Sequence, residues 1–141
     1  MDEMHVVARL QQEMRFAIDT DSGHTVMVNM LDDFEPGVTG VGSSPMELLL
    51  VALAGCTGIS VLSIIRKRKQ DITGYELHVH GTRASQHPKV FTAITVEHIF
   101  TGTKLEVKWI ERAIALSEER YCGVEAMLGK TATITHTYHI L

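Results

Sequence analysis

A run of eighteen residues without formal charge, Leu48 to Ile65, is the feature that most constrains how this chain can fold. Just before it, Ser44, Pro45 and Glu47 have the spacing of a capping box at a helix N-terminus. The basic residues Arg66 to Lys69 follow it and suit the C-terminal end of a helix dipole. The pattern predicts one central helix about 36 Å long, and because it is apolar all round it has to be buried on every side.

The middle of this helix is made of small residues, so another helix or a sheet can approach it closely. They surround Cys56 and are Ala52, Ala54, Gly55, Thr57, Gly58 and Ser60. The length and the basic flank would also suit a membrane anchor. Glycines and hydroxyl groups dilute the hydrophobicity, however, and the rest of the chain reads as a compact domain. We therefore favour a buried core helix and no membrane partner.

Composition narrows the class of protein further. The 141 residues are 45% hydrophobic and 21% charged, which predicts one globular domain over residues 1–141 with a substantial core. A net charge of -4 argues against nucleic acid as a partner. The N-terminus, MDEMHVV, lacks the pattern of a secretory signal, so we expect a cytoplasmic protein.

The rest of the sequence predicts an α+β fold of order β-β-β-α-β-β-α-α-β, because strand patterns and long helical patterns are segregated. Asp19 to Gly23 supplies a turn in the first meander, and we expect Gly123 to end the amphipathic helix. The expected elements are three strands within residues 4–30, a loop over 32–44, the central helix, a hairpin over 72–82 and 90–100, an amphipathic helix over 105–120, a short helix over 124–128 and a strand over 131–141.

One sheet and one amphipathic helix can cover only part of the central helix. The remainder would be a large exposed apolar patch, which soluble proteins avoid. We therefore predict an obligate homodimer in which two central helices pack together or against the partner's sheet.

Two cysteines, Cys56 and Cys122, are too few for a disulfide framework in a domain of this size. They are compatible with a thiol–disulfide cycle, in which one thiolate is oxidised to a sulfenic acid and the second thiol resolves it. Cys56 could equally be a small core residue. A thiol in apolar surroundings has a raised pKa, so a nucleophilic role would need a nearby positive charge.

The spacing of Pro45 and Cys56, eleven positions apart in a long apolar helix, resembles the signature of the OsmC/Ohr family of thiol-dependent peroxidases. The approach GVTGVGSSP resembles that family's loop, and Cys122 stands where the family has its second cysteine. The similarity covers essentially the whole chain and is nearest to an OsmC-like branch with SPME, AGC and RYC motifs.

The resemblance implies an intertwined homodimer with active sites at the subunit interface, which reduces organic hydroperoxides or hydrogen peroxide. Cys56 would be the peroxidatic thiolate and Cys122 the resolving thiol. A dithiol such as a lipoylated protein or thioredoxin would reduce the disulfide. The resemblance implies no metal and no organic cofactor.

The chain departs from the family pattern at the residues that activate the thiol. Met46 replaces the glutamate that follows the proline, and Glu47 comes one residue late. On a continuous helix Glu47 lies roughly opposite Cys56, which favours its capping role. The nearest candidate for the catalytic arginine is Arg15, with Arg9 as second choice. Gly123 stands where many members have a proline.

The histidines are weaker candidates. His78 and His80 share one face of a predicted strand, and His136 and His139 lie in the last strand, so a metal site is conceivable there. Such pairs on strands are more often exposed or hydrogen-bonded, and we predict no metal. Trp109 and Tyr121 are better explained as core or interface packing than as a binding site.

Three functions therefore stay open. The first is a cytoplasmic OsmC-like thiol peroxidase that uses Cys56, Cys122, Arg15 and Glu47. The second is a catalytically weak protein that binds a hydrophobic small molecule beside Cys56, which the presence of Met46 favours. The third is a thiol redox sensor.

Overall fold

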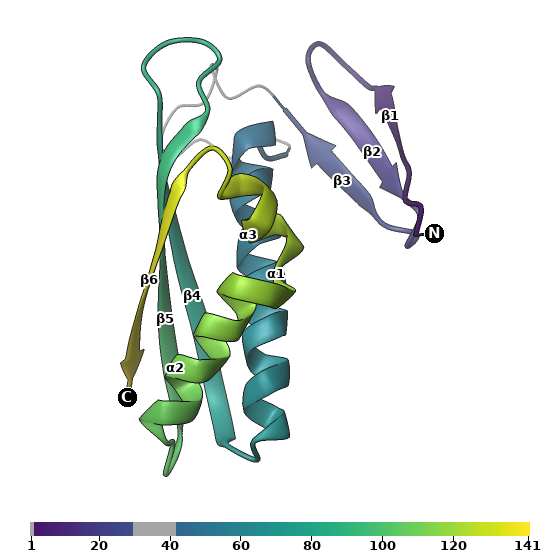
Figure 1. The fold of residues 1–141 in the computed structure, drawn as a ribbon. Coiled ribbons are helices and arrows are strands. Elements are labelled where there is room, and N and C mark those ends of the chain that lie inside the picture. Colours follow the sequence, from purple (N-terminus) through teal and green to yellow (C-terminus); the bar gives the residue numbers. More distant parts are fainter. Residues whose placement is uncertain (1, 30–41) are drawn as a thin grey trace. The chain divides into compact units, whose positions relative to one another are not determined.

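The computed structural model describes residues 2–29 and 42–141. Figure 1 shows the elements, which follow the predicted order. They are β1 (Val6–Leu10), β2 (Phe16–Thr20), β3 (Thr25–Val28), α1 (Pro45–Lys67), β4 (Asp71–Arg83), β5 (Phe91–Thr103), α2 (Val107–Leu116), the π-helical turn η1 (Ser117–Tyr121), α3 (Gly123–Leu128) and β6 (Thr133–Ile140). The α+β class is confirmed. The chain divides into two compact units, Met1–Leu49 and Leu50–Leu141, which are described separately.

The first unit holds an antiparallel meander in the order β1-β2-β3, as the alternation predicts. Ile18 in the central strand faces Ala8 on one side and Val26 on the other. Gly23 lies in the turn between β2 and β3 with a φ of +87°, a conformation that favours glycine. The predicted loop over residues 32–44 lies mostly outside the described residues.

The capping box that the sequence predicts at the start of α1 is formed. The Ser44 Oγ accepts a hydrogen bond from the Glu47 backbone N–H at 3.2 Å and donates one to the Glu47 Oε1 at 2.9 Å. The Ser44 backbone N–H donates to the same carboxylate oxygen at 3.3 Å. These bonds satisfy backbone groups that a helix end leaves free and fix where α1 begins.

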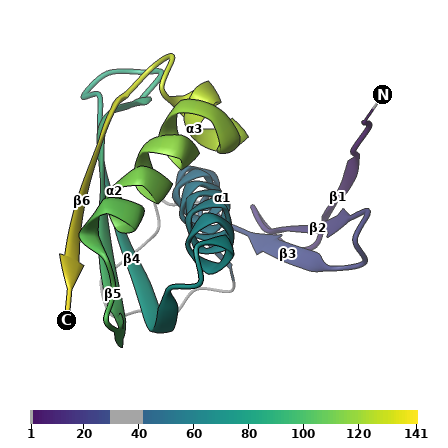
Figure 2. The ribbon, with the colours of Figure 1, turned by 60° about the horizontal axis from the view of Figure 1, so that its bottom comes forward.

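The second unit is a three-stranded sheet, β4-β5-β6, with helices on one face. Strands β4 and β5 form the predicted antiparallel hairpin. Strand β6 runs parallel to β5, so α2, η1 and α3 form the crossover that parallel pairing requires. Figures 1 and 2 show α1 and α2 side by side over this sheet.

The core lies between these helices and the sheet. Val61 and Ile65 of α1 pack with Phe100 of β5 and with Ile110 and Ile114 of α2. A side-chain carbon at Gly58 would lie 3.2 Å from the Leu77 side chain, so the sheet does approach the small residues of α1 closely. The inner face of β5 is fully buried from Ile94 through Val96 and His98 to Phe100.

Within one chain, α1 is buried along one stripe only, at Leu53, Thr57, Val61 and Ile65. Other apolar residues of α1 are exposed, including Leu49, Val51 and Ile59, the last at 74%. A single chain therefore covers only part of this helix, as the sequence analysis predicts. By length and hydropathy α1 could span a membrane, with a mean hydropathy of 2.4. The homodimer that would cover it stays a prediction.

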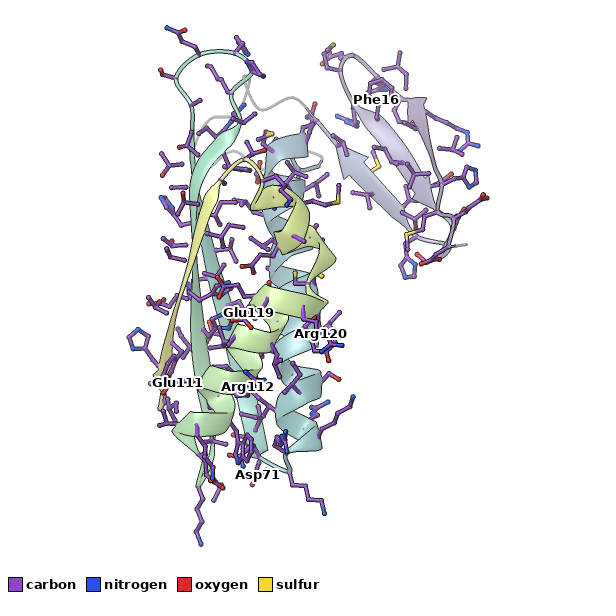
Figure 3. All side chains as sticks on the ribbon, in the orientation of Figure 1. Phe16, Asp71, Glu111, Arg112, Glu119 and Arg120 are labelled. Atoms are coloured by element: carbon purple, nitrogen blue, oxygen red, sulfur yellow. The ribbon has the colours of Figure 1, made fainter. Side chains whose placement is uncertain are left out.

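The predicted helix over residues 105–120 changes geometry before it ends. Helix α2 stops at Leu116, and η1 follows as one π-helical turn. Gly123 does not terminate this helix but is the first residue of α3, and Cys122 is its N-cap. That prediction was wrong because the extended backbone at Cys122 already breaks the helix. Figure 3 labels four charged residues on α2 and η1, Glu111, Arg112, Glu119 and Arg120, all of them exposed.

Candidate functional site

The two cysteines are brought together by α1 and the start of α3. Cys56 is partly buried in the middle of α1, whereas Cys122 is 2% exposed. Thr57, the neighbour of Cys56 in the chain, lies with its Oγ1 3.6 Å from the Cys122 Sγ. The Cys56 thiol is close enough to influence the protonation of Cys122 directly. Both sulfurs are free thiols.

Burial raises the pKa of the Cys122 thiol above its ordinary value, and the neighbouring Cys56 thiol raises it further. The backbone N–H of Glu125, 3.4 Å from the sulfur, and the hydroxyl of Thr57 oppose this increase. A thiol with a raised pKa is a poor nucleophile at neutral pH. Its partner sulfur is therefore the better candidate for the first reaction with an oxidant.

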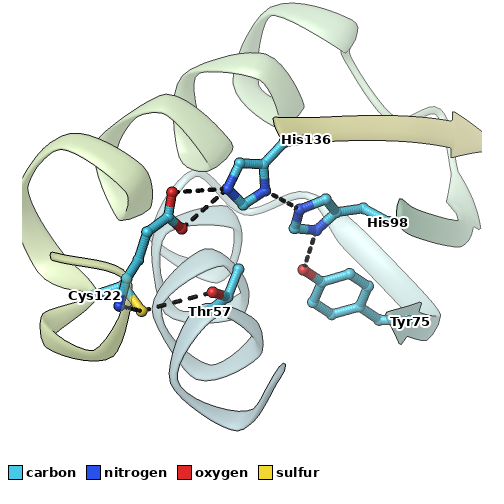
Figure 4. A network of polar contacts seen from close by, with 6 residues as sticks. Thr57, Tyr75, His98, Cys122 and His136 are labelled. Atoms are coloured by element: carbon cyan, nitrogen blue, oxygen red, sulfur yellow. Dashed lines mark hydrogen bonds and ion pairs between the residues drawn. The ribbon is translucent and has the colours of Figure 1, made fainter. Parts of the chain in front are cut away.

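Behind Cys122 a chain of hydrogen bonds crosses the core, as Figure 4 shows. The Tyr75 hydroxyl lies 2.6 Å from the His98 Nδ1, and the His98 Nε2 lies 2.9 Å from the His136 Nδ1. The His136 Nε2 in turn lies 3.0 Å from both carboxylate oxygens of Glu125. The side chains of His136 and Glu125 are only 5% and 6% exposed, and His98 is fully buried.

These contacts have one consistent direction of donation. Burial, assisted by His136, lowers the pKa of His98 to about 4, so this imidazole is neutral at pH 7. Burial also raises the pKa of Tyr75, whose hydroxyl keeps its proton. We assign the Tyr75 hydroxyl as donor to His98, His98 as donor to His136, and His136 as donor to the Glu125 carboxylate. Each ring then carries one proton, and every bond is satisfied.

The other residues singled out from the sequence lie in the first unit. Glu47 is exposed and bonded to Ser44 in the capping box. The Arg9 guanidinium forms an exposed ion pair with Asp19 at 2.6 Å. The Arg15 Nε is buried and has no hydrogen-bond partner among the described residues. Catalytic roles for Arg15 and Glu47 stay predictions.

The four histidines of the two predicted pairs are exposed or hydrogen-bonded, as the sequence analysis favours. His136 and His139 lie on opposite faces of β6, because His136 is buried against Glu125 while His139 forms an exposed pair with Glu97 at 3.2 Å. His78 and His80 are both exposed. Glu118, Glu125 and His136 could offer three metal ligand atoms that lie within 4.8 Å of one another. Two of these residues already bond each other, and we assign no metal.

The sequence analysis missed Tyr75, His98 and Glu125 as members of the site. Signals were present for two of them, since His98 alternates with Ile94, Val96 and Phe100 on the inward face of its strand. Tyr75 shares the alternating pattern of the paired strand β4. Nothing local marks Glu125, which meets His136 only because α3 packs beside β6.

A shallow groove of about 420 Å³ runs beside the Cys56 region of α1. Its lining comes from α1 and β4 and includes Gly55, Gly58, Ile59, Arg66, Thr73 and Tyr75. Most of these side chains are small or apolar. Arg66 brings one positive charge to the groove.

The comparisons with known proteins agree with this fold. Residues 38–137 match the model of a family described as OsmC-like protein, and the chain belongs to this family. The sequence resemblance to OsmC/Ohr proteins is thereby confirmed.

Individual relatives sharpen this assignment. The chain is 36% identical over 129 residues to protein YhfA of Escherichia coli K12, which covers 91% of both chains. A solved structure of a hypothetical protein from Aquifex aeolicus VF5 is 30% identical, with a TM-score of 0.81 over 100% of this chain and 99% of that one. The organic hydroperoxide resistance protein OhrB of Bacillus subtilis shares the fold at 16% identity, with a TM-score of 0.66 and 98% coverage of each chain.

Proposed function

We propose that this protein is a cytoplasmic, homodimeric thiol peroxidase that reduces organic hydroperoxides or hydrogen peroxide. The Cys56 thiolate attacks the peroxide oxygen, which breaks the O–O bond and gives Cys56 sulfenic acid and an alcohol or water. The Cys122 thiol then attacks the sulfenic sulfur to form a disulfide and releases water. A dithiol such as a lipoylated protein or thioredoxin regenerates both thiols.

One observation carries this proposal: the residue next to Cys56 contacts the Cys122 sulfur at 3.6 Å, and the Cys56 thiol helps to raise the pKa of the Cys122 thiol. The family supplies independent support, because a structural relative is named as an organic hydroperoxide resistance protein. In this proposal the more accessible Cys56 sulfur reacts with the peroxide. The buried Cys122 sulfur then resolves the sulfenic acid as a disulfide.

The proposal also assigns two groups that activate the Cys56 thiol. Arg15 is the candidate that would stabilise the Cys56 thiolate, and its buried Nε lacks a partner among the described residues. Glu47 is its proposed carboxylate partner. Replacing Arg15 with glutamine should slow peroxide reduction about 100-fold if this arginine stabilises the developing negative charge. Arg9→Gln is the matched control, because Arg9 pairs with Asp19 in the same sheet, and equal rates in both variants would remove Arg15 from the site.

Steady-state consumption of cumene hydroperoxide and of hydrogen peroxide tests the activity, with reduced lipoamide as the dithiol. We expect catalytic turnover in the wild type and none in the Cys56→Ser variant. A disulfide that forms once without turnover would indicate the redox sensor instead. No reaction of either thiol would exclude both.

The groove beside Cys56 favours one further candidate function, a weakly catalytic binder of a hydrophobic small molecule. Met46, which stands where the family has a glutamate, also favours this function. An apolar fluorescent probe separates this candidate from the peroxidase. Binding that survives Cys56→Ser and is lost in Gly55→Leu, where the added side chain has open space beside the groove, would support it.

A further inference from the structure

The polar chain behind Cys122 is unexpected in a core of this kind. Tyr75 and His98 both stack with the apolar ring of Phe100, with ring centroids 4.5 Å and 6.0 Å from it. A buried ionic group contributes little to net stability, and apolar residues of similar size often serve as well. Stability therefore does not explain the presence of these buried hydrogen bonds.

Glu125 connects this chain of hydrogen bonds to Cys122, because its backbone N–H and its carboxylate are both hydrogen-bonded. Its backbone N–H donates to the Cys122 Sγ at 3.4 Å, and its carboxylate accepts two contacts of 3.0 Å from the His136 Nε2. Fixing the carboxylate thus fixes the turn from Cys122 to Glu125. The Thr57 hydroxyl restrains the same sulfur from the side of α1.

We propose that Glu125, His136, His98 and Tyr75 form a positioning chain that holds the Cys122 sulfur in place for disulfide formation with Cys56. The proposal rests on the thiol chemistry of the proposed function. Tyr75 sets the tautomer of His98, His98 orients His136, and His136 clamps Glu125. None of the four has to react.

The step that the chain serves is the closure of the disulfide. The Cys122 sulfur attacks the Cys56 sulfenic sulfur, the S–O bond breaks, and the hydroxyl leaves with the Cys122 proton as water. Such a step depends on the distance and alignment of the two sulfurs. A loosely held Cys122 would close the disulfide slowly and would form a weaker disulfide.

The molecule supplies a matched control on the opposite face of the same strands. His139 and Glu97 also form a histidine–carboxylate pair between β5 and β6, at 3.2 Å, but their side chains are 59% and 42% exposed. This pair has no contact with either cysteine. Breaking it changes a similar contact without touching the positioning chain.

The test uses the disulfide equilibrium with glutathione, which needs no peroxide. One glutathione disulfide oxidises Cys56 and Cys122 and yields two reduced glutathiones, so the product ratio measures the effective concentration of the two thiols. We expect His136→Leu to lower this effective concentration by about tenfold or more, since the charge-assisted hydrogen bond to Glu125 is lost. His136→Gln keeps a donor for Glu125 and should restore most of it. His139→Leu should leave it within about twofold.

A second variant covers the possibility that His136→Leu does not fold. Tyr75→Phe removes only the distant hydroxyl, and we expect a two- to threefold decrease, roughly the contribution of one neutral hydrogen bond. The rate at which Cys56 reacts with cumene hydroperoxide should change less than the rate of disulfide closure in each folded variant. Equal effective concentrations of the two thiols in the wild type, Tyr75→Phe and His136→Leu would overturn the proposed positioning role. A wild type that forms the disulfide with glutathione but ignores peroxide would overturn the proposed function alone.

Discussion

The surroundings of Cys56 and Cys122 differ in a way that divides the chemistry between them. Cys56 is partly exposed in the middle of α1, next to Gly55, which is exposed and lines a groove. Cys122 is buried, caps α3, and has the Thr57 hydroxyl and the Glu125 N–H as partners. A thiol that meets a substrate needs access, whereas a thiol that closes a disulfide needs a fixed position. One fold thus supplies both conditions at two interacting thiols.

The largest expected effect comes from replacing each cysteine in turn. Cys56→Ser should abolish peroxide-dependent oxidation, while Cys122→Ser should let Cys56 reach the sulfenic acid and then overoxidise to the sulfinic acid. Intact mass measurements after increasing doses of cumene hydroperoxide check this difference. Identical oxidation products in the two variants would contradict the different roles of Cys56 and Cys122.

The raised pKa of Cys122 predicts a pH dependence of disulfide closure. Because burial keeps the sulfur protonated at neutral pH, closure should accelerate by about tenfold per pH unit between about pH 6 and 8. Stopped-flow measurement of the second step, after one equivalent of hydroperoxide, gives this profile. A flat profile over that range would show that the Cys122 thiolate is not the attacking species.

The low pKa of His98 predicts acid sensitivity of the whole domain. Folding favours the neutral imidazole, so stability is full above the unfolded-state pKa of about 6.5 and decreases as the pH falls toward the folded value of about 4. The expected loss is about 2 kcal/mol at pH 5. Urea unfolding at pH 5 and 7 measures it. His98→Gln should remove most of the pH dependence, and an unchanged dependence in that variant would assign it to other groups.

Thr57→Val tests the contact that α1 makes with the Cys122 sulfur. The substitution keeps the volume of a fully buried residue and removes its hydroxyl from the Cys122 sulfur. We expect disulfide closure to slow by about three- to tenfold, as measured by quenched-flow alkylation. Ser63→Ala on the exposed side of the same helix is the control. If both variants close equally fast, Thr57 does not position Cys122.

The smallest effect concerns the start of the helix that carries Cys56. Ser44→Ala removes the capping contacts to Glu47 and should reduce the free energy of unfolding by about 1 kcal/mol. Glu47→Gln retains an acceptor and should cost less. A large loss of peroxide reduction in Glu47→Gln, with stability preserved, would instead support a catalytic role for this carboxylate.

Local patterns predicted most of the fold. The capping residues placed the start of α1, and alternation placed the strands of the hairpin. Parallel pairing of β6 with β5 was not predictable, because it depends on how the crossover helices pack. The π-helical turn before Cys122 also has no clear sequence signal.

The candidate site was predictable only in part. The family-like spacing identified Cys56 and Cys122, but their mutual approach depends on the contact between α1 and α3. The alternation of β6 places His136 and His139 on opposite faces, so a closer use of strand parity would have separated them. The contact of Glu125 with His136 joins residues from two different elements, and no spacing rule specifies it.

Single-turnover oxidation of the fully reduced protein tests the central claim most directly. One equivalent of cumene hydroperoxide or hydrogen peroxide is added, and free thiols and intact mass are followed with time. The account predicts the loss of two thiols per chain and a decrease in mass of about two hydrogens, far faster than for free cysteine. Thiols that remain reduced, or that react no faster than free cysteine, would contradict it.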